Sequence, residues 1–227
     1  MAPREQSRGK CCFCGREMSK GGLTRHLSAC PERKAAIEAA NQQPGREQAI
    51  YHLRAQDDWG GHYWLHLEVQ SSATLGDLDY YLRAIWLECC GHLSMFSIGD
   101  WYGEEIPQSR SIHRVFKPGI EVNHVYDFGT SSYTKIECRD VRKGKPLTDN
   151  PIFLMGRNSP PEIPCMECGE PASWLCMECI AETEASGALC EEHVKSHPHD
   201  RYGEPLPIVN SPRVGMCAYS GPAEPPY

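Results

Sequence analysis

The chain has 227 residues, 13 cysteines and a net charge of -7, a size that allows one ordinary core with small accessory modules. The start MAPREQSRGK has no apolar signal-peptide run and the cysteine count is odd, so we expect a reducing, cytoplasmic location rather than a disulfide-bonded secreted chain. No stretch approaches the roughly 20 apolar residues that span a bilayer, so we expect no membrane role.

Charge and cysteine both concentrate at the two ends of the chain. Residues 1–34 carry eight basic and three acidic side chains, whereas residues 165–227 carry three basic and ten acidic ones. Ten of the 13 cysteines lie in these two segments, and only Cys89, Cys90 and Cys138 lie between them. Only the amino-terminal segment therefore favours a polyanionic partner.

The first predicted module is a zinc finger over residues 1–34. Its predicted ligands are Cys11, Cys14, His26 and Cys30. Two residues separate the first two cysteines, the spacing at which one tight turn directs both thiolates at a tetrahedral ion. Leu23 and Leu27 share a helix face with the last two ligands and close a core too small to fold without metal. Cys12 is the alternative ligand, with poorer geometry because a single residue separates it from Cys14.

The finger has little surface for reading bases. In DNA-reading fingers of this kind, helix positions -1, 3 and 6 contact bases, and these fall on Ser19, Gly22 and Arg25. Gly22 has no side chain to read with. We expect weak, salt-sensitive attachment to nucleic acid, or docking onto a protein, rather than specific reading. The residues assigned to nucleic-acid contact are Arg16, Lys20, Arg25 and Arg33.

A helical spacer over residues 35–47 leads to a predicted α+β domain over residues 48–158. Thr74 is the predicted cap of a helix over 73–88, with Asp77 at its third position. Strands are predicted at 48–56, 62–70, 92–99, 122–128 and 132–141, which implies a mostly antiparallel sheet with the helix on one face.

This central domain shows no pattern that indicates catalysis. Its histidines are His52, His62, His66, His92, His113 and His124, and none is judged to pair with a ligand at metal spacing. No phosphate loop, nucleophile elbow or pair of catalytic carboxylates is present. We interpret the histidines as surface or satisfied core residues and Asp127 as a turn residue.

The carboxyl-terminal segment, residues 159–227, is a predicted two-zinc module. Its candidate ligands are Cys165, Cys168, Cys176, Cys179, Cys190, His193, His197, His199 and Cys217, nine where two tetrahedral ions need eight. In sequential pairing the first four cysteines share one ion. In interleaved pairing, which we prefer, the first two join Cys190 and His193, and the next two join two of the last three candidates. With the finger, about three zinc ions are expected.

The stretch from Tyr51 to Tyr219 resembles the plasmid Orf-three-like family, first described from a root-inducing plasmid and associated with insertion elements. The matching segments are TLGDLDYYLRAIW, HLSMFSIG with the following WYG, VYDFG, MGRNSPPEIPCMECGEPA and LPIVNSPRVGMCAY. The resemblance implies an α+β domain with a zinc-binding tail. Family members often carry cysteine where His199 stands, which favours His199 over His197 as a ligand. Thr130-Ser131-Ser132 departs from the acidic or aromatic run that follows VYDFG in the family.

The family also bears the description resolvase, which the residues do not support. A serine recombinase needs a nucleophilic serine within a cluster of arginines, and neither Ser71-Ser72 nor Ser131-Ser132 has such neighbours in sequence. We therefore expect no enzyme. The leading hypothesis is a zinc-binding adaptor with a protein partner and no small-molecule substrate. The alternative is an accessory nucleic-acid-binding protein that uses the basic finger.

Overall fold

The computed structural model describes residues 7–198 and 201–227. It confirms the α+β class: a nine-stranded, wholly antiparallel sheet forms the body of the protein, and a three-stranded sheet lies in the tail. The large sheet has the strand order β2-β1-β9-β4-β3-β8-β7-β5-β6. Its strands are β1 (Arg8–Cys11), β2 (Glu17–Ser19), β3 (Gln48–Asp57), β4 (Trp64–Gln70), β5 (Ser94–Ile98), β6 (Glu104–Ile106), β7 (Glu121–Tyr126), β8 (Ser132–Gly144) and β9 (Ile152–Asn158).

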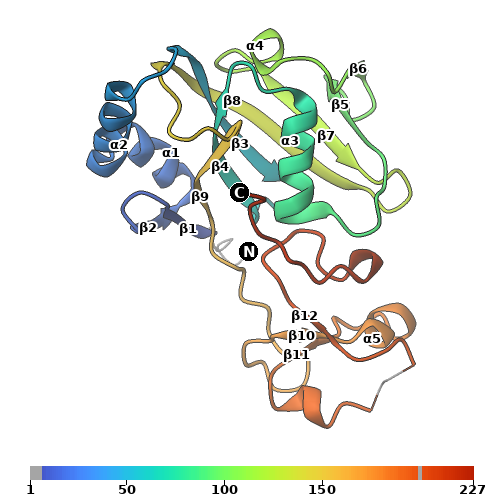
Figure 1. Ribbon diagram of the computed structural model, residues 1–227. Helices are drawn as coiled ribbons and strands as arrows, with labels where there is room; N and C mark the ends of the chain where they lie inside the picture. Colours follow the sequence, from blue (N-terminus) through green and yellow to red (C-terminus); the bar gives the residue numbers. More distant parts are fainter. Residues whose placement is uncertain (1–6, 199–200) are drawn as a thin grey trace.

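One face of the sheet is covered by α3 (Leu75–Leu82), which continues into the π-helical turn η1 (Arg83–Leu87) (Figure 1). Thr74 and Asp77 form the predicted capping box: the Asp77 backbone N–H donates to Thr74 Oγ1 at 3.1 Å, and the Thr74 N–H donates to Asp77 Oδ2 at 2.7 Å. Leu78 and Leu82 pack against buried side chains of β3, β4 and β8 in the main core. The short α4 (Ile112–Val115) adds Ile112 to this core.

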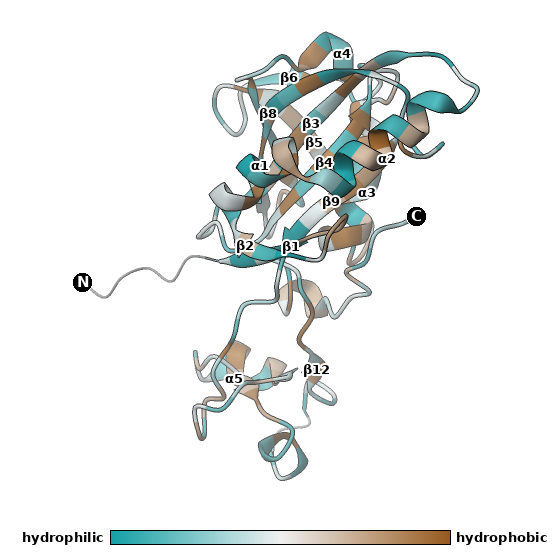
Figure 2. Ribbon diagram, turned by 90° about the vertical axis from the view of Figure 1, so that its left-hand side faces the viewer, coloured by the Kyte–Doolittle hydropathy of each residue, from teal (hydrophilic) through white to brown (hydrophobic). Residues whose placement is uncertain are grey.

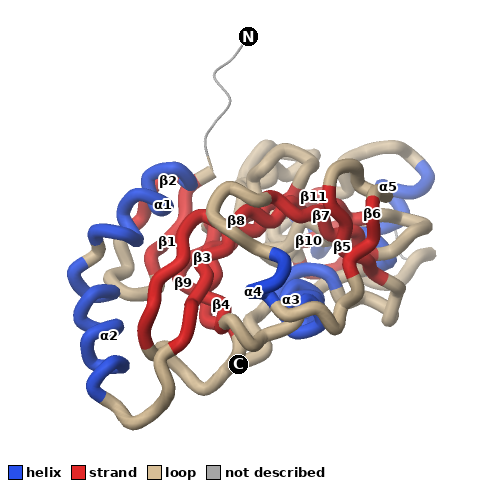
Figure 3. Tube along the Cα trace, turned by 90° about the horizontal axis from the view of Figure 1, so that it is seen from above, coloured by secondary structure: helices blue, strands red, loops and turns tan. Residues whose placement is uncertain are grey.

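The opposite face is covered by the amino-terminal segment, which contains α1 (Lys20–Ala29) and α2 (Pro31–Gln42) (Figure 3). Leu23 and Leu27 of α1 form a second apolar cluster with Trp64 and Met155 of the sheet. This coverage explains why β4 is buried on both faces although its sequence alternates. The polar side chains on the second face of β4 have partners inside the protein. For example, the Glu68 carboxylate forms ion pairs with Arg142 and Arg33.

The finger strands extend the large sheet rather than standing apart from it. β1 pairs with β2 on one side and with β9 on the other, where Gly9 faces Asn158 and Cys11 faces Gly156. Gly9 permits this close approach, since a Cβ there would lie 2.2 Å from the carbonyl oxygen of Arg157. The amino-terminal segment is therefore joined to the central sheet by main-chain hydrogen bonds as well as by apolar packing.

The C-terminal module lies below the large sheet in Figure 1 and is connected to it by two extended segments. It contains β10 (Trp174–Leu175), β11 (Ala188–Leu189), β12 (Leu206–Pro207), α5 (Met177–Glu182) and the turn η2 (His193–Lys195). The chain then returns to the central domain, where it forms the turn η3 (Met216–Ala218). None of the helices in the described ranges is long and apolar enough to cross a membrane.

Candidate metal centres

Among the residues that the structure describes, four groups of cysteine and histidine side chains converge, and each could hold a metal ion. With Zn–S near 2.3 Å and Zn–N near 2.0 Å, two thiolates on one tetrahedral ion lie about 3.8 Å apart, and a thiolate and an imidazole nitrogen about 3.6 Å apart. Within each group the ligand atoms all lie within 4.8 Å of one another. All 13 cysteines are described and none forms a disulfide.

The finger site consists of Cys11, Cys14, His26 and Cys30. The first two cysteines flank a turn closed by the Gly15 N–H, which donates to the Cys11 carbonyl oxygen at 2.9 Å, and Gly15 has φ 70°. His26 is presented by α1, and its Nε2 lies 3.2 Å from Cys14 Sγ. The helix thus places its ligand over the turn, and all four predicted finger ligands come together.

Burial affects how easily the thiols of the finger site lose their protons. Cys11 and Cys30 are fully buried, and burial raises the pKa of Cys11 to about 11. A buried thiolate needs a counter-charge, which a bound cation supplies. Cys12, the alternative ligand, is exposed and lies outside the group of converging ligands.

The finger helix α1 begins at Lys20, and Ser19 caps it by accepting the Gly22 N–H at 3.3 Å. Two of the four cations assigned to nucleic acid are engaged inside the protein. Lys20 donates to Gln56 Oε1 at 2.6 Å, and the buried Arg33 donates to the Leu27 carbonyl oxygen at 2.9 Å. The expectation that Arg33 contacts phosphate is therefore corrected. Arg16 and Arg25 are exposed.

The first tail site consists of Cys165, Cys168, Cys190 and His193. His193 Nδ1 lies 3.2 Å from Cys190 Sγ and 3.7 Å from Cys165 Sγ, and the sulfurs of Cys168 and Cys190 lie 3.9 Å apart. Desolvation works to raise the pKa of the Cys165 thiol, but backbone N–H groups of Glu167, Cys168 and Cys190 outweigh it and lower the pKa to about 6. These donors favour the thiolate that a metal binds.

The second tail site brings together Cys176, Cys179 and His197. His197 Nε2 lies 3.3 Å from Cys179 Sγ. His199, also a predicted ligand, lies outside the described residues. The structure thus arranges the tail ligands in the interleaved pairing, with Cys165 and Cys168 on one group and Cys176 and Cys179 on the other.

Cys217 does not join either tail site, which corrects its assignment to the two-zinc module. The chain has returned to the central domain at this point, and the Cys217 sulfur lies with Cys89, Cys90 and His92. We call these four residues the junction cluster. Its signal in the sequence was the short run Cys89-Cys90-Gly91-His92 together with an unneeded ninth tail ligand. The prediction that no central histidine pairs with a cysteine at ligand spacing is therefore wrong for His92.

Beneath the junction cluster lies Arg213, a fully buried arginine with a dense set of acceptors. Its guanidinium donates to Asp127 Oδ2 at 2.6 Å and contacts Cys89 Sγ at 3.3 Å and Cys217 Sγ at 3.5 Å. Asp127 is a turn residue as predicted, with φ 65° and an acceptor oxygen for the Gly129 N–H. It is also the buried counter-ion of this arginine.

The remaining central histidines lie in structural contacts or on the surface. His52 and His66 form a buried pair with Nε2 and Nδ1 2.8 Å apart, and the buried His124 lies 2.7 Å from Asp79 Oδ1. Burial, reinforced by neighbouring arginines, lowers the pKa of His52 to about 3, so that the ring is neutral at pH 7. His62 and His113 are exposed.

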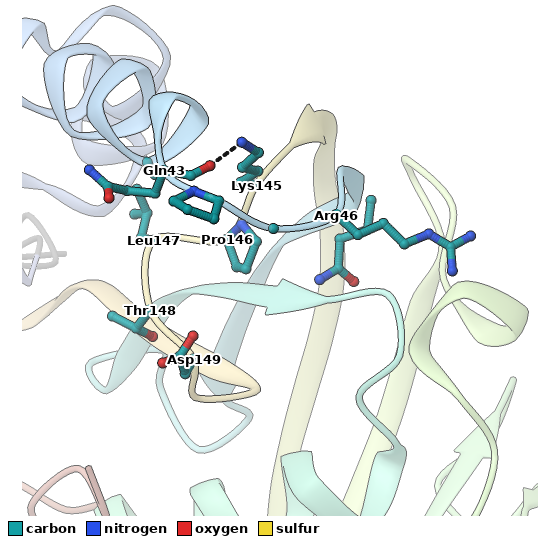
Figure 4. Close-up of a pocket in the computed structure, with 11 residues that line it drawn as sticks. Gln43, Arg46, Lys145, Pro146, Leu147, Thr148 and Asp149 are labelled. Atoms are coloured by element: carbon teal, nitrogen blue, oxygen red, sulfur yellow. Dashed lines mark hydrogen bonds between the residues drawn. The ribbon is translucent and has the colours of Figure 1, made fainter.

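A hollow of about 430 Å³ lies between the end of α2 and the segment that joins β8 to β9 (Figure 4). Lys145 closes one side of it and donates to the carbonyl oxygens of Asn41 and Gln43, where it caps the helix end. The lining contains no cysteine or histidine, and its charged side chains are Arg46, Lys145 and Asp149. This hollow therefore offers none of the ligand groups that distinguish the four Cys/His groups.

The comparisons with known proteins name no function. No protein-family model matches the chain, and no curated protein matches it. A crystal structure of a protein of unknown function from Methanosarcina mazei Go1 is similar over 48% of this chain and 67% of that chain, with 17% sequence identity and a TM-score of 0.39. A similarity at this level carries no argument about function, so any functional assignment rests on the chemistry of the four Cys/His groups.

Proposed function

We propose that the chain is a zinc-binding adaptor of a mobile-element-associated family, which acts by holding another protein rather than by catalysis. Zinc is the proposed metal because the finger site and the two tail sites each combine thiolates with one imidazole, a donor set that suits Zn²⁺. In this role the bound ions fix the shape of the binding surfaces and take no part in a reaction.

The observation that carries the proposal is the C-terminal module. It projects from the central domain on two extended segments (Figure 1), so its surface is open to a partner on most sides. Its exposed side chains are rich in glutamate, including Glu167, Glu170, Glu184, Glu192 and Glu204. An acidic, metal-stiffened module suits a basic protein surface, because complementary charge speeds encounter and selects the partner.

Affinity purification of the intact, zinc-loaded chain tests this role. A charge reversal on the module, Glu170→Lys with Glu192→Lys, should remove the bound protein. A matched reversal on the exposed strand β6, Glu104→Lys with Glu105→Lys, should leave it bound. Retention of the same protein by both variants would contradict docking through the acidic module.

The alternative function is nucleic-acid binding through the amino-terminal segment. It is favoured by the exposed Arg16 and Arg25 and by the hydrophilic β1–β2 hairpin beside them (Figure 2). Gly22 occupies the central reading position, so the attraction would be to phosphates and not to bases. Removing residues 1–34 is a poor test, because Leu23 and Leu27 are part of the core. Substitution of the two exposed arginines is the cleaner experiment.

A further inference from the structure

We propose that the junction cluster of Cys89, Cys90, His92 and Cys217 is a fourth metal site, for Zn²⁺ or a similar thiophilic divalent ion, and that it clamps the returning chain to the central domain. This site is separate from the finger site and from the C-terminal module, and it does not depend on the proposed adaptor role. Its donors are three sulfurs and one imidazole, the same set as in the finger site.

The geometry fits a tetrahedral ion. The four ligand atoms lie within 4.8 Å of one another, and Cys217 Sγ lies 3.8 Å from His92 Nε2, close to the roughly 3.6 Å expected for a thiolate and an imidazole on one zinc. Three of the ligands come from one short segment directly after the π-helical turn η1, and Gly91, at φ 72°, makes the turn between them. The fourth ligand comes from a segment 125 residues away in sequence from His92.

The backbone at Cys217 is held in an unfavourable conformation. Cys217 has φ 50° and ψ 36°, and Ala218 follows with φ 56°. A left-handed conformation is unfavourable for a non-glycine residue, so two in succession require a compensating contact. Coordination of the Cys217 sulfur supplies such a contact at the strained position.

A buried cation lies against two of the sulfurs of the junction cluster. A divalent metal with three thiolates carries a net charge of -1, and the buried guanidinium of Arg213 contacts the sulfurs of Cys89 and Cys217 at 3.3 and 3.5 Å. The Asp127 carboxylate pairs with the same arginine at 2.6 Å and holds its guanidinium in this position. The N–H groups of Arg213 that face the sulfurs of Cys89 and Cys217 hold these ligands in orientation and favour the thiolate form.

The clamp lies where the tail rejoins the body. The Ser211 hydroxyl donates to the Trp86 carbonyl oxygen at 2.6 Å, and the Gly215 N–H donates to the Tyr219 carbonyl oxygen at 3.0 Å, so the returning segment is ordered on both sides of Cys217. Cys90 and Cys217 are exposed, in contrast to the fully buried Cys11 and Cys30 of the finger site. We therefore expect a chelator to remove the junction ion before the finger ion.

The test is the zinc content of the intact chain, purified with zinc under reducing conditions, for wild type and single variants. Cys217→Ser should hold one ion fewer than wild type. Cys12→Ser, an exposed cysteine outside every group, should hold the wild-type number. His92→Gln is the second variant and should lose the same ion. With a chromophoric chelator, wild type and Cys12→Ser should release one ion more, ahead of the finger ion, than both junction variants.

Hydrogen exchange of the Gly215 and Tyr219 amides reports whether the returning chain stays attached to the central domain. Protection there should fall in Cys217→Ser and His92→Gln, while amides of β3 keep wild-type protection. Equal zinc content in wild type and in both junction variants would overturn the proposal. So would a disulfide from Cys217 to Cys89 or Cys90 in protein purified without added reductant, since a covalent pair would replace the metal as the link.

Discussion

Removal of metal should unfold the C-terminal module while the central sheet stays folded. The module has a very small apolar core, in which Leu175 and Leu189 are the buried leucines beside Cys176 and Cys179. The central core, by contrast, includes large fully buried side chains such as Trp86, Tyr126 and Phe96. The two parts therefore depend on metal to very different degrees, and a chelator should separate them.

The magnitudes support this separation. Full burial of a leucine contributes about 1.5–3 kcal/mol, so Leu175 and Leu189 together contribute about 5 kcal/mol. A structural zinc ion contributes about 10–16 kcal/mol in small zinc-folded domains. Without its ions the module has no comparable source of stability.

Hydrogen exchange measured by mass spectrometry before and after chelation is the suitable assay. Trp174 faces Leu189 and Leu175 faces Ala188 in the small sheet, so peptides that cover these residues report on the module. They should exchange at the rate of an unfolded chain once metal is removed. Peptides from β3, a central strand of the large sheet, should remain protected. Persistent protection of the module peptides after complete metal removal would show that the module folds without its ions.

Three further outcomes are expected. In the interleaved arrangement Cys165→Ser and Cys190→Ser should release the same tail ion. The zinc content of the double variant should then match that of either single variant, whereas an additive loss would indicate sequential pairing. Binding to unrelated DNA duplexes, measured across a salt series, should weaken about tenfold from 50 to 200 mM salt. Only Arg16 and Arg25 of the four assigned cations are free, and each neutralised phosphate adds about -0.9 to the slope of log affinity against log salt. The double variant Arg16→Gln with Arg25→Gln should abolish this binding, and the control Arg46→Gln, at another exposed arginine, should not. The pKa of His52 is about 3 in the fold and about 6.5 unfolded, so its contribution to stability is complete above pH 6.5 and falls as the pH drops towards 3. From pH 7 to 5 wild type should lose about 2 kcal/mol of unfolding free energy that His52→Gln does not lose, by denaturant titration; an equal loss in both would contradict the buried, neutral ring.

Local patterns predicted the elements whose causes are local. Thr74 and Asp77 are three residues apart and cap their helix by direct hydrogen bonds, so the sequence contains the whole interaction. The alternation in residues 62–70 likewise predicted β4. The burial of its second face was not predictable in the same way, because it depends on Leu23 and Leu27, which arrive from a distant segment.

Some candidate ligands were likewise predictable from local spacing in the sequence, and others were not. Pairs such as Cys165 and Cys168 lie within one turn of chain, and their spacing alone marks them as ligands. Cys217 meets His92 only because the chain leaves the central domain, forms the tail module and returns. Spacing in sequence carries no information about that meeting. The burial of Arg33 against the Leu27 carbonyl is a similar tertiary effect, and it removed a cation that looked available.

Metal ions held by converging cysteine and histidine side chains are, in our interpretation, what shapes the two ends of this protein. Anomalous diffraction at the zinc absorption edge, from crystals of the intact chain grown with zinc and reductant, would locate such ions without further assumptions. We expect separate peaks within the finger site, the two tail sites and the junction cluster. The absence of peaks at the finger and tail sites, with those cysteines present as free thiols, would contradict the interpretation.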